Sequence, residues 1–186
     1  KLVTDLKGKI AEIRRGKIRR IGIVIDQDTH SQQNRLDFLN EAIAVAYGQN
    51  NVLQAVNQLF SVDLDEDTTV EIACHLMNVK GAGELETVLK AIKTLPAPNA
   101  DCLETWRACV EAKGQTVKEK EFVKSWIQNY IRLDSCISSK FRGNKNKYCS
   151  MRGLDQILAR TGAKVTFDLN HAILGDLKTF LRLFPS

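Results

Sequence analysis

The stretch that decides the fold is residues 20–29, which read Arg20-Ile21-Gly22-Ile23-Val24-Ile25-Asp26-Gln27-Asp28-Thr29. Its apolar and β-branched residues predict a strand over residues 19–26. The strand ends in two carboxylates spaced i, i+2, and residues two apart in a strand point to the same side of a sheet. We therefore expect Asp26 and Asp28 to leave the strand on one face, close together.

Two neighbouring carboxylates suit a divalent cation. They repel each other unless a positive charge lies between them. Mg²⁺ prefers oxygen ligands and is commonly held by one or two carboxylates and several waters, as in many phosphoryl-transfer enzymes. The alternative is structural, because a strand often ends in Asp when Asp opens a turn or caps the next helix.

The flanking sequence predicts the start of a βαβ unit. Apolar spacing indicates a helix over residues 1–16, and another over residues 33–47 that Gly48 caps. A second strand is expected over residues 69–79, followed by a glycine-containing break and a helix that begins near residue 84. Residues 50–60 fit either a short helix or turns, and residues 61–64 fit a short strand.

From residue 101 onward the pattern is helical. Helices are expected over about 101–113, 117–133, 154–159 and 172–184, with Asp101 as candidate N-cap of the first. Trp106 and Trp126 lie on amphipathic faces and are predicted core residues. The predicted fold is α/β: a small, mainly parallel sheet flanked by helices in residues 1–95, and a mainly helical C-terminal part of the same domain in residues 96–186.

The positive charge is concentrated at two places. The chain has 186 residues and a net charge of +5. One basic cluster lies within residues 9–20, and the second consists of Lys140, Arg142, Lys145, Lys147 and Arg152. Such clusters suit a polyanion such as DNA or RNA, although basic residues are often only a solvated surface. Arg142, Lys145 and Lys147 are the candidate nucleic-acid contacts, and Tyr148 is a candidate for stacking on a base.

The five cysteines predict no zinc site, because none has zinc-finger spacing. We expect reduced, mostly buried thiols in a cytoplasmic protein. No apolar run approaches the length of a transmembrane helix, so no membrane association is predicted.

Four segments, taken in order, resemble a family of mostly uncharacterised prokaryotic Toprim-like proteins, related to the Toprim domains of OLD-type nucleases. They are Ile21 to Thr29, the helix from Arg35 to Gly48, the stretch Gly83-Glu84-Leu85-Glu86-Thr87-Val88-Leu89, and the stretch Lys124-Ser125-Trp126-Ile127-Gln128-Asn129-Tyr130-Ile131. The ending, with Phe167-Asp168 and then Leu177, Phe180 and Leu181, also fits. The resemblance implies a Toprim-like fold and a metal-dependent phosphoryl-transfer site.

The resemblance also assigns roles to single residues. It implies that Asp26 and Asp28 bind Mg²⁺ or Mn²⁺, with Glu86 as a further acid and Glu84 as the weaker candidate. It implies that Lys124, or secondarily Lys120, stabilises charge in the transition state. The plainer alternatives are that the two glutamates complement a helix dipole and that the lysines are surface residues.

Three functions remain open. The first is a metal-dependent Toprim-type nuclease, with a role in antiphage defence. The second is a noncatalytic interaction subunit that docks on a partner such as an ATPase, and the third is a nucleic-acid-binding module; a homo-oligomer is compatible with each. The Toprim pattern normally begins with a strand that ends in Glu-Gly, so we expect that strand upstream of Lys1, on a partner chain, or lost.

The three histidines are secondary candidates. His30, two residues after Asp28, is a candidate for metal or substrate binding, although loop histidines are commonly only solvated. His75 and His171 are predicted to be packing or surface residues.

Overall fold

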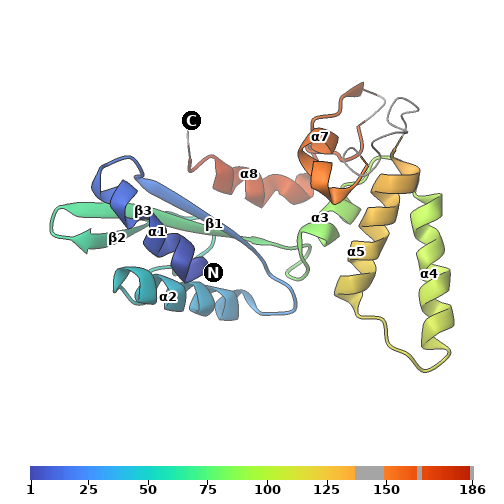
Figure 1. The fold of residues 1–186 in the computed structure, drawn as a ribbon, viewed down its shortest axis with the longest axis horizontal. Coiled ribbons are helices and arrows are strands. Elements are labelled where there is room, and N and C mark those ends of the chain that lie inside the picture. Colours follow the sequence, from blue (N-terminus) through green and yellow to red (C-terminus); the bar gives the residue numbers. More distant parts are fainter. Residues whose placement is uncertain (137–148, 163–164, 185–186) are drawn as a thin grey trace. The chain divides into compact units, whose positions relative to one another are not determined.

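The computed structural model describes residues 1–136, 149–162 and 165–184. It divides into two compact units (Figure 1). Unit 1 consists of Lys1–Glu84 together with Leu174–Ser186, and unit 2 consists of Leu85–Ile173. The last helix of the chain therefore belongs to the unit that holds the sheet. No helix among the described residues is long and apolar enough to cross a membrane.

Unit 1 is built on a three-stranded mixed sheet. Its elements are α1 (Leu2–Arg14), β1 (Arg20–Asp26), α2 (Gln32–Tyr47), β2 (Phe60–Asp65), β3 (Thr68–Met77) and α8 (Gly175–Leu181). The strand order is β1-β3-β2, with β1 parallel and β2 antiparallel to β3. The α/β class is confirmed, but a mainly parallel sheet is not, because only two residues connect β2 to β3 and so short a turn joins antiparallel strands.

The two faces of the sheet carry different helices (Figure 1). One face packs on α1 and α2 through a core that includes Leu39 and Ile43 of α2 and Ile72 of β3, all fully buried. The other face accepts α8 because residue 22 is glycine. A Cβ atom at Gly22 would lie only 3.1 Å from Cζ of Phe180 in α8, and 3.0 Å from Cζ of Phe184 just after that helix.

Local sequence signals set the ends of α2. Ser31 is its N-cap and accepts a hydrogen bond from the backbone N–H of Asn34 at 3.1 Å. Gly48 ends the helix with φ of +80°, a left-handed conformation that glycine adopts without steric cost. Both ends lie within one residue of the predicted helix.

The segment from residue 50 to 59 contains no helix, which decides between the two alternatives left open. Asn40 of α2 holds it as a loop, donating to the carbonyl of Leu53 at 2.9 Å and accepting from its N–H at 2.7 Å. The N–H of Asn57 donates to the carbonyl of Cys74 at 2.8 Å. A buried side chain thus supplies the hydrogen bonds that a helix would have made internally.

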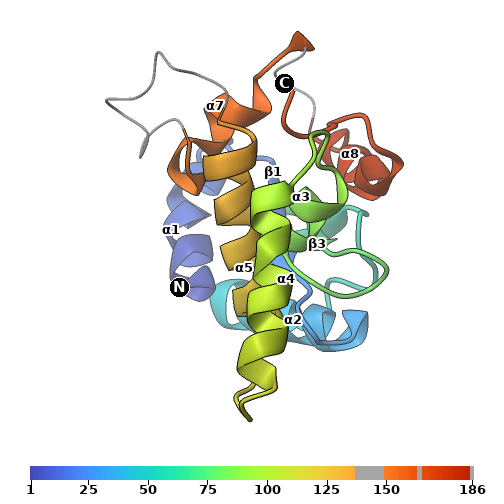
Figure 2. The same cartoon turned by 90° about the vertical axis from the view of Figure 1, so that its right-hand side faces the viewer.

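Unit 2 is helical in its described part. It contains α3 (Leu85–Ala91), α4 (Pro98–Glu111), α5 (Glu119–Asn129) continuing into the π-helix η1 (Tyr130–Asp134), the 3₁₀ helix η3 (Met151–Gly153) and α7 (Leu154–Leu158). A further 3₁₀ helix, η5 (Ala172–Leu174), spans its boundary with unit 1. Figure 2 shows α4 and α5 side by side.

An aromatic column forms the centre of unit 2. Trp126 and Tyr130 are fully buried and stacked with ring centroids 5.4 Å apart, and Phe167 meets Tyr130 edge-on at 5.8 Å. The Tyr130 hydroxyl donates to the Thr166 carbonyl at 3.0 Å and accepts from the Leu95 N–H at 3.1 Å. Burial raises the pKa of this phenol, so it stays a neutral donor.

Two predictions about α4 are wrong. Trp106 is 49% exposed, whereas Trp126 is confirmed as a core residue. Asp101 is not the N-cap, because the helix begins at Pro98 and the Asp134 carboxylate accepts from the N–H groups of Asn99 and Ala100. The Asp101 carboxylate instead accepts from the indole N–H of Trp126 at 3.2 Å.

The cysteine prediction is also wrong in part. Cys136 and Cys149 form a disulfide, and Cys102 and Cys109 are exposed. Cys74 alone is a buried free thiol, and burial raises its pKa to about 11. The paired cysteines are 13 residues apart, so their spacing gave no motif to recognise.

Candidate functional site

The candidate acids gather at the carboxyl end of the parallel pair β1 and β3. Asp26 is the last residue of β1 and lies opposite Met77, the last residue of β3. The loops that follow both strands, residues 27–31 and 78–84, therefore start from the same edge of the sheet. Ligands of open α/β sheets bind outside the carboxyl ends of the strands.

Backbone hydrogen bonds join these two loops. Asp28 and Gly83 form an antiparallel bridge in which each N–H donates to the other's carbonyl, at 2.7 and 2.8 Å. The buried Gln27 side chain donates to the carbonyl of Gly81 at 2.7 Å, and its backbone N–H donates to the carbonyl of Met77 at 3.0 Å. The loop that carries Asp28 is thus fixed to the loop that follows β3.

Asp28 does not continue the strand. Its φ is +53°, a left-handed conformation that Asp tolerates better than most residues but that still costs free energy. The expectation that both acids share one side of a strand therefore applies only to Asp26. What positions Asp28 is the bridge to Gly83.

The Asp28 carboxylate has a cationic partner. It forms a partly buried ion pair with Arg35 of α2, whose side chain also donates to the carbonyl of Gln27 at 3.2 Å. The exposed fractions of the two side chains are 27% for Asp28 and 16% for Arg35. The guanidinium supplies positive charge beside Asp28, where the sequence predicted a metal ion.

The two candidate glutamates fall in different units. Glu84 follows Gly83 directly, belongs to unit 1 with the aspartates, and is only 3% exposed. Glu86 lies in the first turn of α3 in unit 2. Sequence reasoning ranked Glu86 first, yet Glu84 is the acid adjacent to the Asp28 bridge. No three His, Cys, Asp or Glu side chains among the described residues form a group that could hold a metal ion.

The remaining candidates come from other segments of the chain. Lys124 and Lys120 lie on α5 in unit 2. His30 is exposed in the loop after β1, and His171 is exposed in unit 2. The predicted nucleic-acid contacts Arg142, Lys145 and Lys147, and Tyr148 with them, lie outside the described residues.

His75 is buried on the sheet face that packs on α8. One ring nitrogen is 2.9 Å from the Asn57 amide oxygen, and the ring centroid is 5.6 Å from that of Phe180. Burial lowers the pKa of His75, and the negative charge of Asp176 in α8 opposes that shift. The packing role predicted for this histidine is confirmed.

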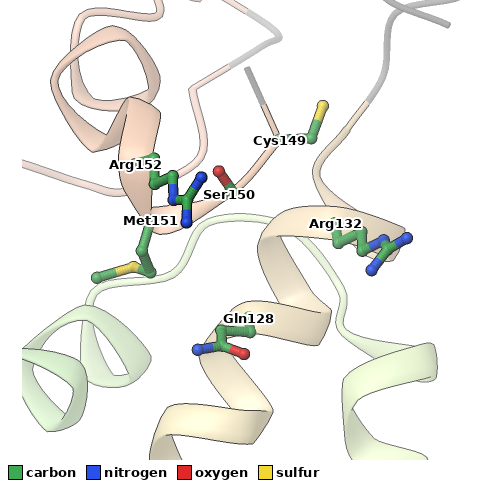
Figure 3. Close-up of a pocket in the computed structure, with 6 residues that line it drawn as sticks. All are labelled: Gln128, Arg132, Cys149, Ser150, Met151 and Arg152. Carbon is green, nitrogen blue, oxygen red and sulfur yellow. The ribbon is translucent and has the colours of Figure 1, made fainter. Parts of the chain in front are cut away.

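A second group of polar side chains lies in unit 2. Gln128 and Arg132, one helical turn apart on α5 and η1, line a pocket together with residues 149–152 (Figure 3). The sequence placed Arg152 in a basic cluster but gave no reason to connect it with Arg132. The i, i+4 spacing of Gln128 and Arg132 was the only available signal, and it is too common to identify a site.

Fold and site together define a small α/β protein with an acid-bearing loop pair at the end of two parallel strands. The chain belongs to the family DUF3226, described as proteins of unknown function, whose model matches residues 1–184. No curated protein matches the chain, and no solved structure does.

Proposed function

We propose that this protein is a divalent-metal-dependent phosphoryl-transfer protein, and specifically a Toprim-type nuclease. The observation that supports the proposal is the fixed loop pair after β1 and β3, which holds Asp26 and Asp28 at the ligand-binding edge of an α/β sheet. The ordered resemblance described above is its second support. Loops that tie a strained aspartate in place are common at functional sites.

In this proposal Asp26 and Asp28 hold Mg²⁺ or Mn²⁺. A bound divalent ion supplies Lewis-acid polarisation of a phosphate oxygen and activation of a water. Asp28 would hold the ion with carboxylate oxygens that also accept from Arg35. Glu84, which directly follows Gly83 of the bridge, is the further candidate acid within unit 1. The roles of Glu86 and Lys124, which lie in unit 2, rest on the resemblance alone.

A cellular role follows from the same resemblance. We place the nuclease in a prokaryotic cytoplasm, in antiphage defence or another form of nucleic-acid processing. The Cys136–Cys149 disulfide is unusual for that compartment, where thiols are generally kept reduced. In a cytoplasm this bond would be a redox-responsive element.

One observation favours a second candidate function. The Arg35 guanidinium already neutralises Asp28, so this edge of the sheet is stable without a metal ion. A noncatalytic Toprim-like subunit that docks on a partner such as an ATPase would require no bound metal ion at this site. The two candidates differ in whether Asp26 and Asp28 matter for chemistry or only for folding.

A nuclease assay separates the two candidates. The full chain is incubated with plasmid and single-stranded DNA and RNA in Mg²⁺, Mn²⁺ or EDTA, beside Asp26→Asn and Asp28→Asn. Asp37→Asn is the matched control, since Asp37 is an exposed acid of α2. We expect metal-dependent cleavage that falls roughly 100-fold in the first two variants, because metal activation contributes several kcal/mol. Folded wild-type protein without cleavage, or cleavage that survives in Asp26→Asn, would refute the nuclease.

A further inference from the structure

Unit 2 has a hollow of about 380 Å³ that the acid-bearing loops do not share. Gln128 and Arg132 line it from α5 and η1, and Cys149, Ser150, Met151 and Arg152 line it from the facing segment (Figure 3). Sites for small organic ligands span roughly 300–1,000 Å³. The hollow therefore has room for a group larger than a lone inorganic ion.

The lining is positively charged. Of the described residues, two arginines and no carboxylate contribute to it. Neither Arg132 nor Arg152 forms an ion pair with a carboxylate of the described residues, whereas Arg14, Arg20, Arg35 and Arg107 all do. Charge of one sign, gathered from two segments and left without a described counter-charge, favours an anionic ligand.

The chemistry of the lining narrows the class of anion. The planar guanidinium matches the oxygens of phosphate with paired N–H donors, and the Gln128 amide adds neutral donors. Ser150 places a hydroxyl on the same wall. Met151 supplies a polarisable apolar surface of the kind that packs against aromatic rings. Phosphate next to a flat ring is the chemistry of a nucleotide.

Covalent and polar ties hold the walls of the pocket. The Cys136–Cys149 disulfide joins the lining segment to the chain just after η1. Arg160, after α7, donates to the Ser135 carbonyl and to the Thr166 hydroxyl, both at 3.0 Å. Ser135 itself donates to the Ile131 carbonyl at 3.2 Å. The disulfide thus fixes the Cys149 end of the lining segment before a ligand arrives, which lowers the entropic cost of binding.

We propose that this pocket binds the phosphate group of a nucleotide, either free or within a nucleic-acid strand, through Arg132 and Arg152. The inference deepens the proposed function by naming how substrate is held, and it rests on that function for nucleic acid as a source of the nucleotide. Binding needs no divalent ion, so it is measured in EDTA, where cleavage cannot occur.

The test uses the full chain with three probes in EDTA: AMP by calorimetry, and a labelled single-stranded DNA oligonucleotide with or without a 5′-phosphate by fluorescence anisotropy. The variants are Arg132→Gln and Arg152→Gln. Lys113→Gln is the control, because it removes the same charge from an exposed site in unit 2. Each arginine variant is expected to weaken binding about tenfold or more, since hydrogen bonds to charged groups contribute about 1.5–3 kcal/mol.

The outcomes are distinct. Loss of AMP binding in both arginine variants supports a pocket for a free nucleotide. If both variants lose binding to the oligonucleotides only, the result supports a pocket for a phosphate within a nucleic-acid strand. Wild-type protein that binds none of the probes, or equal weakening in Lys113→Gln, overturns the proposal. Because Asp26→Asn is expected to bind normally in EDTA while losing cleavage, failure of the nuclease proposal remains distinguishable.

Discussion

The two units of this protein differ in whether the charged groups of their candidate sites have ion-pair partners among the described residues. In unit 1 the acid of the candidate site is neutralised in place, with Asp28 paired to Arg35 and fixed by backbone bonds to Gly83. In unit 2 the two arginines of the pocket have no described ion pair, and a disulfide anchors one wall. In the first arrangement Asp28 has a counter-charge within the protein, whereas in the second the arginines have none among the described residues. Four predictions test this contrast.

The largest effect is expected in the aromatic core of unit 2. Trp126→Ala removes a fully buried side chain that stacks on Tyr130, and should destabilise the protein by about 3–5 kcal/mol. Trp106→Ala is the matched control, because that indole is 49% exposed and its loss should change the free energy of unfolding by less than about 0.5 kcal/mol. Urea unfolding measures both, and equal losses would contradict the described packing.

The second-largest effect on stability is expected from removal of the disulfide. Cys136→Ser opens a covalent loop of 13-residue separation, and loops of this size contribute about 3 kcal/mol in the chain-entropy account. Cys102→Ser, at an exposed free thiol, should leave stability unchanged. Urea unfolding with and without a phosphine reductant provides the check. Reduction should lower the free energy of unfolding of the wild type but not that of Cys136→Ser. An unchanged wild-type value would show that the bond is absent or does not contribute to stability.

A smaller effect is expected where unit 1 neutralises its acid. Arg35→Gln leaves the partly buried Asp28 carboxylate without its guanidinium, at a cost of about 1–2 kcal/mol. Arg14→Gln is the control, since the Arg14–Asp65 pair is exposed to solvent and its loss should change stability less than the loss of Arg35.

Thermal unfolding of Arg35→Gln, with and without millimolar Mg²⁺, then sharpens the contrast between the units. An ion that binds at Asp28 should restore part of the lost stability, because a ligand bound only by the folded state stabilises it. Identical thermal unfolding midpoints with and without Mg²⁺ would indicate that the Asp28–Arg35 pair has only a structural role.

The smallest effect is a dependence of stability on pH at His75. Burial depresses its folded-state pKa below the ordinary 6.5, so the folded protein keeps the ring neutral. The contribution of the neutral His75 ring to folding stability is therefore complete above about pH 6.5 and is lost as the pH falls through the folded-state pKa. Asp176 of α8 is the charged group that opposes the depression, and Asn57 and Phe180 are the neutral contacts.

Thermal unfolding between pH 7.5 and 5.0 checks this expectation. His75→Phe should show a shallower decline than the wild type, while His30→Gln, at an exposed loop position, should decline in parallel with it. Parallel decline in all three proteins would exclude His75 as the responsible group.

Local signals in the sequence were enough to predict much of unit 1. The apolar run that ends at Asp26 placed β1, and Ser31 and Gly48 mark the ends of α2 through their own capping chemistry. The antiparallel placement of β2 was missed because strand order depends on a two-residue turn and on pairing across the sheet.

Features that depend on distant residues could not be predicted in the same way. The cap of α4 comes from Asp134, which follows the helix start by more than thirty residues, whereas the predicted cap, Asp101, is a local residue. Arg132 and Arg152 line one pocket although no spacing in the sequence connects them, and Arg35 was recognised only as the opening of a helix. Glu84 gained importance over Glu86 only through the bridge between Asp28 and Gly83.

The central claim is that the acids at the end of β1 bind a divalent cation. Mn²⁺ titration of the full chain, followed by electron paramagnetic resonance and calorimetry, tests this claim without any assay of activity. We predict one Mn²⁺ site per chain, competed by Mg²⁺ and lost in both Asp26→Asn and Asp28→Asn but retained in Asp37→Asn. Folded wild-type protein that binds no Mn²⁺, or binding unaffected by either of the first two substitutions, would contradict the account.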